Sequence, residues 1–176
     1  MKLTLTYRGK LPPTQRRVSS VKGALRAAFH PQIKAQIERR LGKPATEVET
    51  DFQGHKFISP AHEKFRTAAE LDVLILTPNS SRSVGDVDNR LKTLVDGLTR
   101  PANPQQMQGF QPPPGGGSTY CLMDGDQLVK RLTVDARPWF EVGVPDNEAL
   151  VVVTATIVLG DNVDMTSPMG NVFLVL

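Results

Sequence analysis

Apolar residues follow two different periods along this chain, and each period occupies its own segments. Strand-like alternation or short apolar runs occur at residues 2–8, 71–76, 128–134 and 150–159. Helical spacing fills residues 18–41 and returns in a segment that begins near Asp86. The pattern predicts an α+β fold, in which a small sheet of about four strands has helices packed on one face.

Proline and glycine separate these segments. Pro31 is expected to bend or restart the first helix, because proline lacks the backbone N–H that a helix needs. Residues 47–61 are ambiguous and allow short strands. Residues 100–119 are rich in Pro, Gln and Gly, so we expect a flexible loop there. The chain is predicted to form one domain over residues 1–160, followed by a tail over residues 161–176.

Positive charge is concentrated in the first part of the chain. The net charge is +3, yet residues 1–66 hold 14 Lys and Arg against 5 Asp and Glu. Positive patches attract the phosphate backbone of nucleic acids whatever their sequence, although an ordinary solvated basic helix has the same composition. The candidates for phosphate contacts are Lys10, Arg16, Arg17, Lys22 and Arg26.

Composition argues against several other classes of protein. The chain has no apolar run of about 18 residues, and residues 1–7 alternate like a strand and do not form the apolar core of a secretory signal. Cys121 is the single cysteine, which excludes an internal disulfide and favours a small buried residue. His30, His55 and His62 lack metal-ligand spacing. We expect a soluble, cytoplasmic protein with no membrane partner.

Three aspartates and a lysine lie close together in the helical segment 85–98. Asp86 and Asp88 stand at its amino end, where carboxylates accept hydrogen bonds from free backbone N–H groups and suit the positive end of the helix dipole. Asp88, Lys92 and Asp96 recur at i, i+4 and i+8, a spacing that simple ion pairing also produces. The residues alone leave open both a capped, solvated helix and a metal site.

Together with acidic residues further along, this segment resembles a known family. Gly-Asp-Val-Asp-Asn at residues 85–89, then Lys92, Asp96-Gly-Leu and Asp124-Gly-Asp126-Gln, are similar to the RusA family of Holliday junction resolvases. The resemblance implies a mixed sheet, a homodimer and a bacterial or phage-encoded protein that resolves four-way DNA junctions in recombination and repair. It also implies that aspartates hold Mg²⁺, with Mn²⁺ able to substitute, for phosphodiester hydrolysis.

The first part of the match assigns Asp86, Asp88 and Lys92 by their places in the family's motif, with the aspartates as metal ligands and all three as catalytic residues. Their chemistry suits the reaction, because a divalent metal offsets the charge of a phosphodiester and supplies hydroxide at neutral pH. Mg²⁺ prefers hard oxygen ligands and keeps several waters, so two or three carboxylates suffice. Lys92, one turn beyond Asp88, would stabilise charge that develops at the scissile phosphate.

The downstream part of the match departs from the family's pattern. Gly125 separates two aspartates that are usually adjacent in the family. With the apolar alternation of the following strand as the guide, Asp126 takes the third catalytic and metal-binding position, and Asp124 is the alternative ligand. Composition alone would favour a simple turn at these residues.

Two functions other than a nuclease also fit the residues. One is a DNA-junction-binding protein of the same fold that does not cut, which the Gly125 departure suggests. The other is a metal-binding, phosphoryl-handling protein unrelated to DNA, for which an Asp-x-Asp pair would suffice. A short distance between Asp126 and the pair of Asp86 and Asp88 would favour the nuclease over the last of these.

Overall fold

The structure is a computed structural model that describes residues 1–12, 18–42, 45–78, 85–107, 110–146 and 148–160. The helices in those ranges are α1 (Val18–Leu41) and α2 (Gly85–Leu98). The strands are β1 (Lys2–Lys10), β2 (Glu49–Phe52), β3 (His55–Ile58), β4 (Thr67–Pro78), β5 (Thr119–Tyr120), β6 (Val129–Trp139) and β7 (Glu148–Leu159). Short 3-10 helices are η1 (Thr46–Val48), η2 (Glu63–Phe65), η3 (Pro104–Met107) and η4 (Asp126–Leu128).

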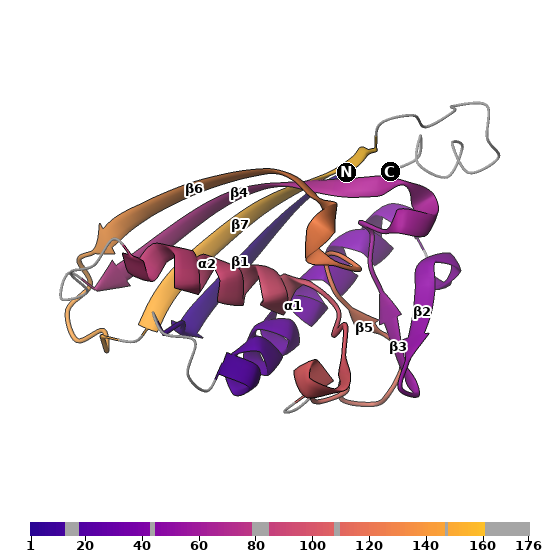
Figure 1. The fold of residues 1–176 in the computed structure, drawn as a ribbon, viewed down its shortest axis with the longest axis horizontal. Helices are drawn as coiled ribbons and strands as arrows, with labels where there is room; N and C mark the ends of the chain where they lie inside the picture. Colours follow the sequence, from indigo (N-terminus) through magenta and orange to yellow (C-terminus); the bar gives the residue numbers. More distant parts are fainter. Residues whose placement is uncertain (13–17, 43–44, 79–84, 108–109, 147, 161–176) are drawn as a thin grey trace.

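The main sheet has the strand order β1-β7-β4-β6 (Figure 1). β7 pairs antiparallel with both β1 and β4, whereas β4 and β6 run parallel. The sheet is therefore mixed, and the predicted α+β class is confirmed. Its register brings Lys10 opposite Glu148 and Pro78 opposite Trp139. The ends of β1, β4 and β6 and the start of β7 consequently lie at one end of the sheet.

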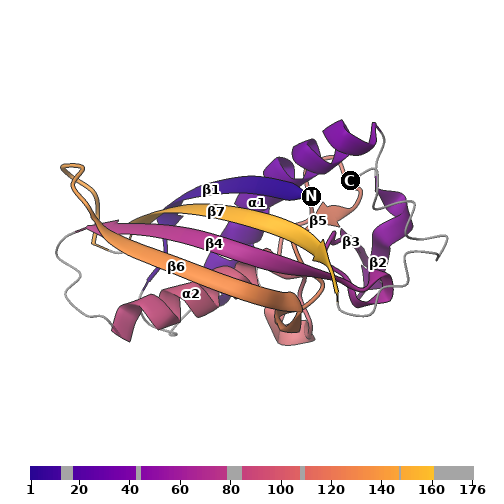
Figure 2. The same ribbon diagram turned by 90° about the horizontal axis from the view of Figure 1, so that it is seen from above.

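Both helices lie against one face of the main sheet (Figures 1 and 2). α1 buries Leu25, Phe29, Ile33 and Ile37, which recur with the helical period. Every second residue of β7 from Ala149 to Ile157 is buried as well. Full burial of one such large apolar side chain is worth about 1.5–3 kcal/mol, so this shared core holds both helices on the sheet.

Of the bend or restart expected at Pro31, the restart does not occur. α1 is one helix from Val18 to Leu41 with Pro31 inside it, on its exposed side. A proline inside a helix costs about 3 kcal/mol or more. Here Phe29 and Ile33 are buried on either side of Pro31, and their packing on the sheet offsets that cost.

The short strands that the sequence allowed in residues 47–61 are present as β2 and β3. Their assembly with β5 into a second, smaller sheet with the order β2-β3-β5 was not predicted. Gln53 and Gly54 both have positive φ, 53° and 74°, so β2 and β3 are joined by a tight turn of the kind that favours glycine. Asp51 Oδ1 accepts a hydrogen bond from the Gly54 N–H at 3.2 Å. β5 runs parallel to β3 and is only two residues long, too short for a period to appear in the sequence.

The segment that was predicted as a flexible loop, residues 100–119, packs on the second sheet at several points. The Phe110 ring lies 5.2 Å from the His55 ring and 5.4 Å from the Phe57 ring, measured between centroids. The tail over residues 161–176 lies outside the described residues. Among the described helices, none has the length and apolar character needed to span a membrane.

Candidate functional site

α2 presents part of its acidic first turn and Lys92 to solvent. Asp88 and Lys92 are both exposed and lie about one helical turn apart. The buried side of the helix carries Arg90, Leu94 and Leu98. The helix begins at Gly85, close to the predicted start, and the side chain of Asp86 lies outside the described residues.

Arg90 ties α2 to the segment that follows β1. Its side chain is 2% exposed, and its Nη1 donates a hydrogen bond to the backbone carbonyl oxygen of Leu11. Leu11 is itself buried and directly follows Lys10, which is exposed. A buried arginine near the exposed Asp88 therefore fixes the segment of Lys10 and Leu11 beside the first half of α2. This role of Arg90 was not predicted from the sequence.

Further basic side chains lie at the same end of the main sheet as Lys10 and the start of α2. Arg8 donates to Glu141 at 2.8 Å, and its guanidinium lies 4.8 Å from the centroid of the Trp139 ring. Arg137 is exposed near the end of β6 and pairs with Asp135. We call Arg8, Lys10 and Arg137 the basic end of the sheet. Sequence analysis missed Arg8 and Arg137, because only the strand register brings them together with Lys10.

Asp124, the alternative third ligand, is held by a neighbouring arginine. Arg100 Nη2 donates to Asp124 Oδ2 at 3.2 Å, and Arg100 Nε donates to Asp124 Oδ1. His62 Nε2 lies 3.8 Å from the same Oδ1. Both carboxylate oxygens are thus engaged, and the side chain is 14% exposed. In this arrangement Asp124 neutralises a cation of its own chain, which leaves it poorly suited to hold a metal.

Asp126, the preferred third ligand, lies at the opposite end of α2 from Asp88. It is exposed at the start of η4, just before β6. The Leu122 N–H donates to the Leu98 carbonyl at 2.9 Å, so the residues leading to Asp126 contact the last turn of α2. From Asp88 to Leu98 the helix advances about 15 Å, at about 1.5 Å per residue. The structure therefore does not bring Asp88 and Asp126 of one chain together.

Two of the predicted phosphate-contacting residues are engaged inside the protein. Lys22 Nζ pairs with Asp96 Oδ2 at 2.5 Å, which links α1 to α2. Arg26 is 2% exposed and donates from Nε to the Thr99 carbonyl and from Nη2 to the Asp96 carbonyl, both at 2.8 Å.

Burial lowers the pKa of Arg26, with Cys121 and Asp96 acting in the opposite sense. Its guanidinium caps the carboxyl end of α2, and a group so enclosed does not reach a phosphate, so its prediction as a DNA contact is corrected. Arg16 and Arg17 lie outside the described residues.

Cys121 is buried, as the sequence predicted. Its side chain is 2% exposed, and burial raises the pKa of its thiol to about 12. The thiol is therefore protonated at neutral pH and cannot act as a nucleophile.

The acidic residues fit a magnesium ion only in part. Mg²⁺ is commonly held by one or two carboxylates with waters and substrate phosphates, and Asp88 is exposed as such a ligand must be. Across the described part of the chain, no group of three or more His, Cys, Asp or Glu side chains is arranged to hold a metal. The Asp86 side chain lies outside that part of the chain.

No protein-family model matches the chain, and the search of curated proteins gave no match. The likeness to the RusA family therefore rests on the residues of the α2 segment and on Asp124 to Asp126.

Proposed function

We propose that this protein is a Mg²⁺-dependent endodeoxyribonuclease that acts on branched DNA, as the RusA resemblance implies. The observation that carries the proposal is the pair of Asp88 and Lys92, which are exposed one turn apart on α2. Their helix begins at the same end of the sheet as Arg8, Lys10 and Arg137. Carboxylates and basic side chains at one end of a protein suit a nuclease, because the basic side chains attract phosphates and the carboxylates bind the metal.

In this proposal the catalytic centre lies at the start of α2. Asp86 and Asp88 hold Mg²⁺, which, when bound, polarises the scissile phosphate and lowers the pKa of its bound water. Lys92 lies on the next turn, on the exposed side of the helix, and stabilises the negative charge that develops on the phosphate oxygens. Asp126 lies beyond the reach of this site within one chain, so we assign it no metal-binding role there.

The basic end of the sheet is proposed to position DNA. Arg8 and Arg137 are half or more exposed, and both already pair with a carboxylate of their own chain. Exchange of such an exposed ion pair for a phosphate costs little, because exposed pairs contribute about 0–1 kcal/mol. We expect a homodimer, because resolution of a four-way junction requires a cut in each of two strands.

A second candidate function is DNA-junction binding without cleavage. It is favoured by the engagement of Asp124 with Arg100 and by the separation of Asp126 from Asp88. Such a protein would use the same basic end but would lack a complete set of metal ligands.

The experiment that separates the two functions uses a synthetic mobile four-way junction and a linear duplex of matched sequence. Each is incubated with the protein in Mg²⁺, in Mn²⁺ and in EDTA, and both binding and strand cleavage are measured. The nuclease proposal expects paired, metal-dependent nicks on the junction. Binding of the junction with no cleavage in either metal would favour the binding protein instead.

A further inference from the structure

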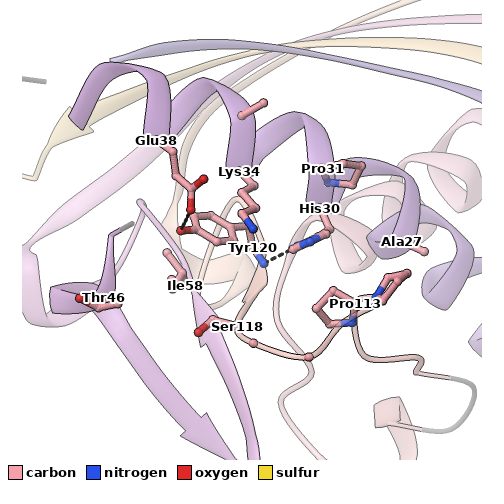
Figure 3. A pocket seen from close by; sticks show the side chains of 14 residues that line it. Ala27, His30, Pro31, Lys34, Glu38, Thr46, Ile58, Pro113, Ser118 and Tyr120 are labelled. Carbon is pink, nitrogen blue, oxygen red and sulfur yellow. Dashed lines mark hydrogen bonds between the residues drawn. The ribbon is translucent and has the colours of Figure 1, made fainter. Parts of the chain in front are cut away.

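A groove lies along α1, on the side of the molecule that carries the second sheet (Figure 3). It encloses about 690 Å³, within the range of about 300–1,000 Å³ that is usual for small-molecule sites. His30, Lys34 and Glu38 line one wall at successive turns of α1. Residues 113–118 form part of the opposite wall, and Tyr120 lies between them. We call this space the α1 groove.

Hydrogen bonds fix the walls of the α1 groove. The Tyr120 N–H donates to His30 Nδ1 at 2.9 Å, and the Tyr120 hydroxyl donates to Glu38 Oε1 at 2.8 Å. Across the groove, the Gly116 N–H donates to the Pro113 carbonyl at 3.1 Å and closes a turn. The groove is therefore formed without a ligand, which reduces the entropy cost of binding.

The polar groups of the α1 groove differ along its length. His30 Nδ1 accepts a hydrogen bond, so in the neutral ring Nε2 carries the proton and is a donor. Burial and Lys34 lower the pKa of His30, whereas Glu38 acts in the opposite sense. Because the pKa is lowered overall, the ring is neutral at neutral pH. Lys34 adds a cationic donor one turn further along, and Glu38 follows with a carboxylate about 6 Å beyond it.

Apolar surfaces lie at the His30 end of the groove (Figure 3). The rings of Pro31 and Pro113 and the side chain of Ala27 line the groove. Burial and the bond to Glu38 raise the pKa of Tyr120 to about 12, so its hydroxyl stays protonated and occupies one oxygen of Glu38. A ligand that matches the groove has an anionic group for Lys34 and His30 and a flat apolar body for the surfaces of Ala27, Pro31 and Pro113.

We propose that the α1 groove binds a single nucleotide, with its phosphate at Lys34 and His30 and its base against Ala27, Pro31 and Pro113. Inorganic phosphate would leave the apolar walls uncovered. The ligand is either a free nucleotide or an unpaired nucleotide within a DNA strand.

Calorimetric titration of the full chain with deoxyadenosine 5′-monophosphate tests the proposal. We expect saturable binding that weakens about tenfold in Lys34→Ala, as the loss of one hydrogen bond to a charged group predicts. The matched control is Arg39→Ala, because Arg39 is also exposed on α1 but does not line the groove. This control should bind within about twofold of wild type.

Comparison of ligands makes the test specific. Deoxyadenosine and inorganic phosphate should each bind more weakly than deoxyadenosine 5′-monophosphate. Tighter binding of a short single-stranded oligonucleotide would identify the strand as the source, and equal or weaker binding would identify the free nucleotide. No saturable binding, or equal weakening in Lys34→Ala and Arg39→Ala, would overturn the proposal. The groove is independent of the α2 site, so Asp88→Asn should retain this binding even if the nuclease proposal fails.

Discussion

The guanidinium of Arg100 donates hydrogen bonds to both carboxylate oxygens of Asp124. Arg100 Nη2 donates to Asp124 Oδ2 at 3.2 Å while Nε donates to Oδ1, and both side chains are less than one-fifth exposed. The same guanidinium lies 5.6 Å from the centroid of the Phe52 ring, so the pair also joins the end of α2 to the second sheet. Such a bidentate pair is a structural contact, and its loss should be visible as a change in stability.

Substitution of either partner in this pair should lower the free energy of unfolding. We expect Arg100→Met and Asp124→Asn each to cost about 1–3 kcal/mol, because each leaves a partly buried polar group without its partner. The double variant should cost less than the sum, with a coupling of about 0.5–3 kcal/mol in urea unfolding. Additive losses would contradict the pairing. Loss of Mg²⁺-dependent cleavage in Asp124→Asn with unchanged stability would instead assign Asp124 to the metal.

Arg26 is expected to stabilise the protein and not to bind DNA. Arg26→Met keeps the aliphatic stem but removes the donors to the Thr99 and Asp96 carbonyls, so the free energy of unfolding should fall by about 2–4 kcal/mol. Arg39→Met, on the exposed surface of the same helix, is the control and should change stability by less than about 0.5 kcal/mol. A stable Arg26→Met protein with weakened DNA binding would show that the guanidinium reaches phosphate.

His30 should make stability depend on pH. Burial, with Lys34, holds the pKa of His30 below its ordinary value of 6.5, against the opposite effect of Glu38. The unfolded chain therefore binds this proton more readily, so the free energy of unfolding falls as the pH drops below about 6.5. His30→Asn retains an acceptor for the Tyr120 N–H and removes the titrating ring. Its free energy of unfolding should depend less steeply on pH between about pH 6.5 and pH 5 in urea titrations. Parallel curves for variant and wild type would contradict this.

Phe140 is a candidate DNA contact that contributes little to the stability of the fold. Its side chain is 78% exposed just after β6, near the basic end of the sheet. Stacking of a base on an aromatic ring contributes about 1–3 kcal/mol, so Phe140→Ala should weaken junction binding about fivefold or more. Its thermal unfolding midpoint should match that of wild type. The test is fluorescence anisotropy with a labelled junction, and unchanged affinity would exclude Phe140 from the interface.

The sequence predicted the parts of the fold that have a long, regular pattern. α1 was predicted over residues 18–41 and is found there, because its buried residues from Leu25 to Ile37 recur over about three turns of helix. β6 extends past the predicted limit to Trp139, because an edge strand tolerates Pro138. The second sheet was missed, since β5 has two residues and its pairing with β3 is decided by tertiary contacts.

The candidate site was less predictable than the fold. Sequence spacing correctly indicated that Asp88 and Lys92 share an exposed part of α2, because helical geometry fixes that relation. It gave no information on the distance to Asp126, which depends on how β6 follows the far end of α2. It also could not show that Arg26 is buried, because a basic residue on a helix has the same spacing whether it faces solvent or caps a neighbour.

The central claim is that Asp88 is a ligand of a catalytic Mg²⁺, and cleavage of a four-way junction by three Asp→Asn variants tests it most directly. Asp51→Asn is the matched control, because Asp51 is exposed in the second sheet and asparagine can still accept the hydrogen bond from Gly54. We predict that Asp88→Asn loses Mg²⁺-dependent cleavage by about 100-fold or more while it still binds the junction, the scale expected for loss of a group that stabilises the transition state. Asp51→Asn and Asp126→Asn should both cut at the wild-type rate. Wild-type cleavage by Asp88→Asn would contradict the account.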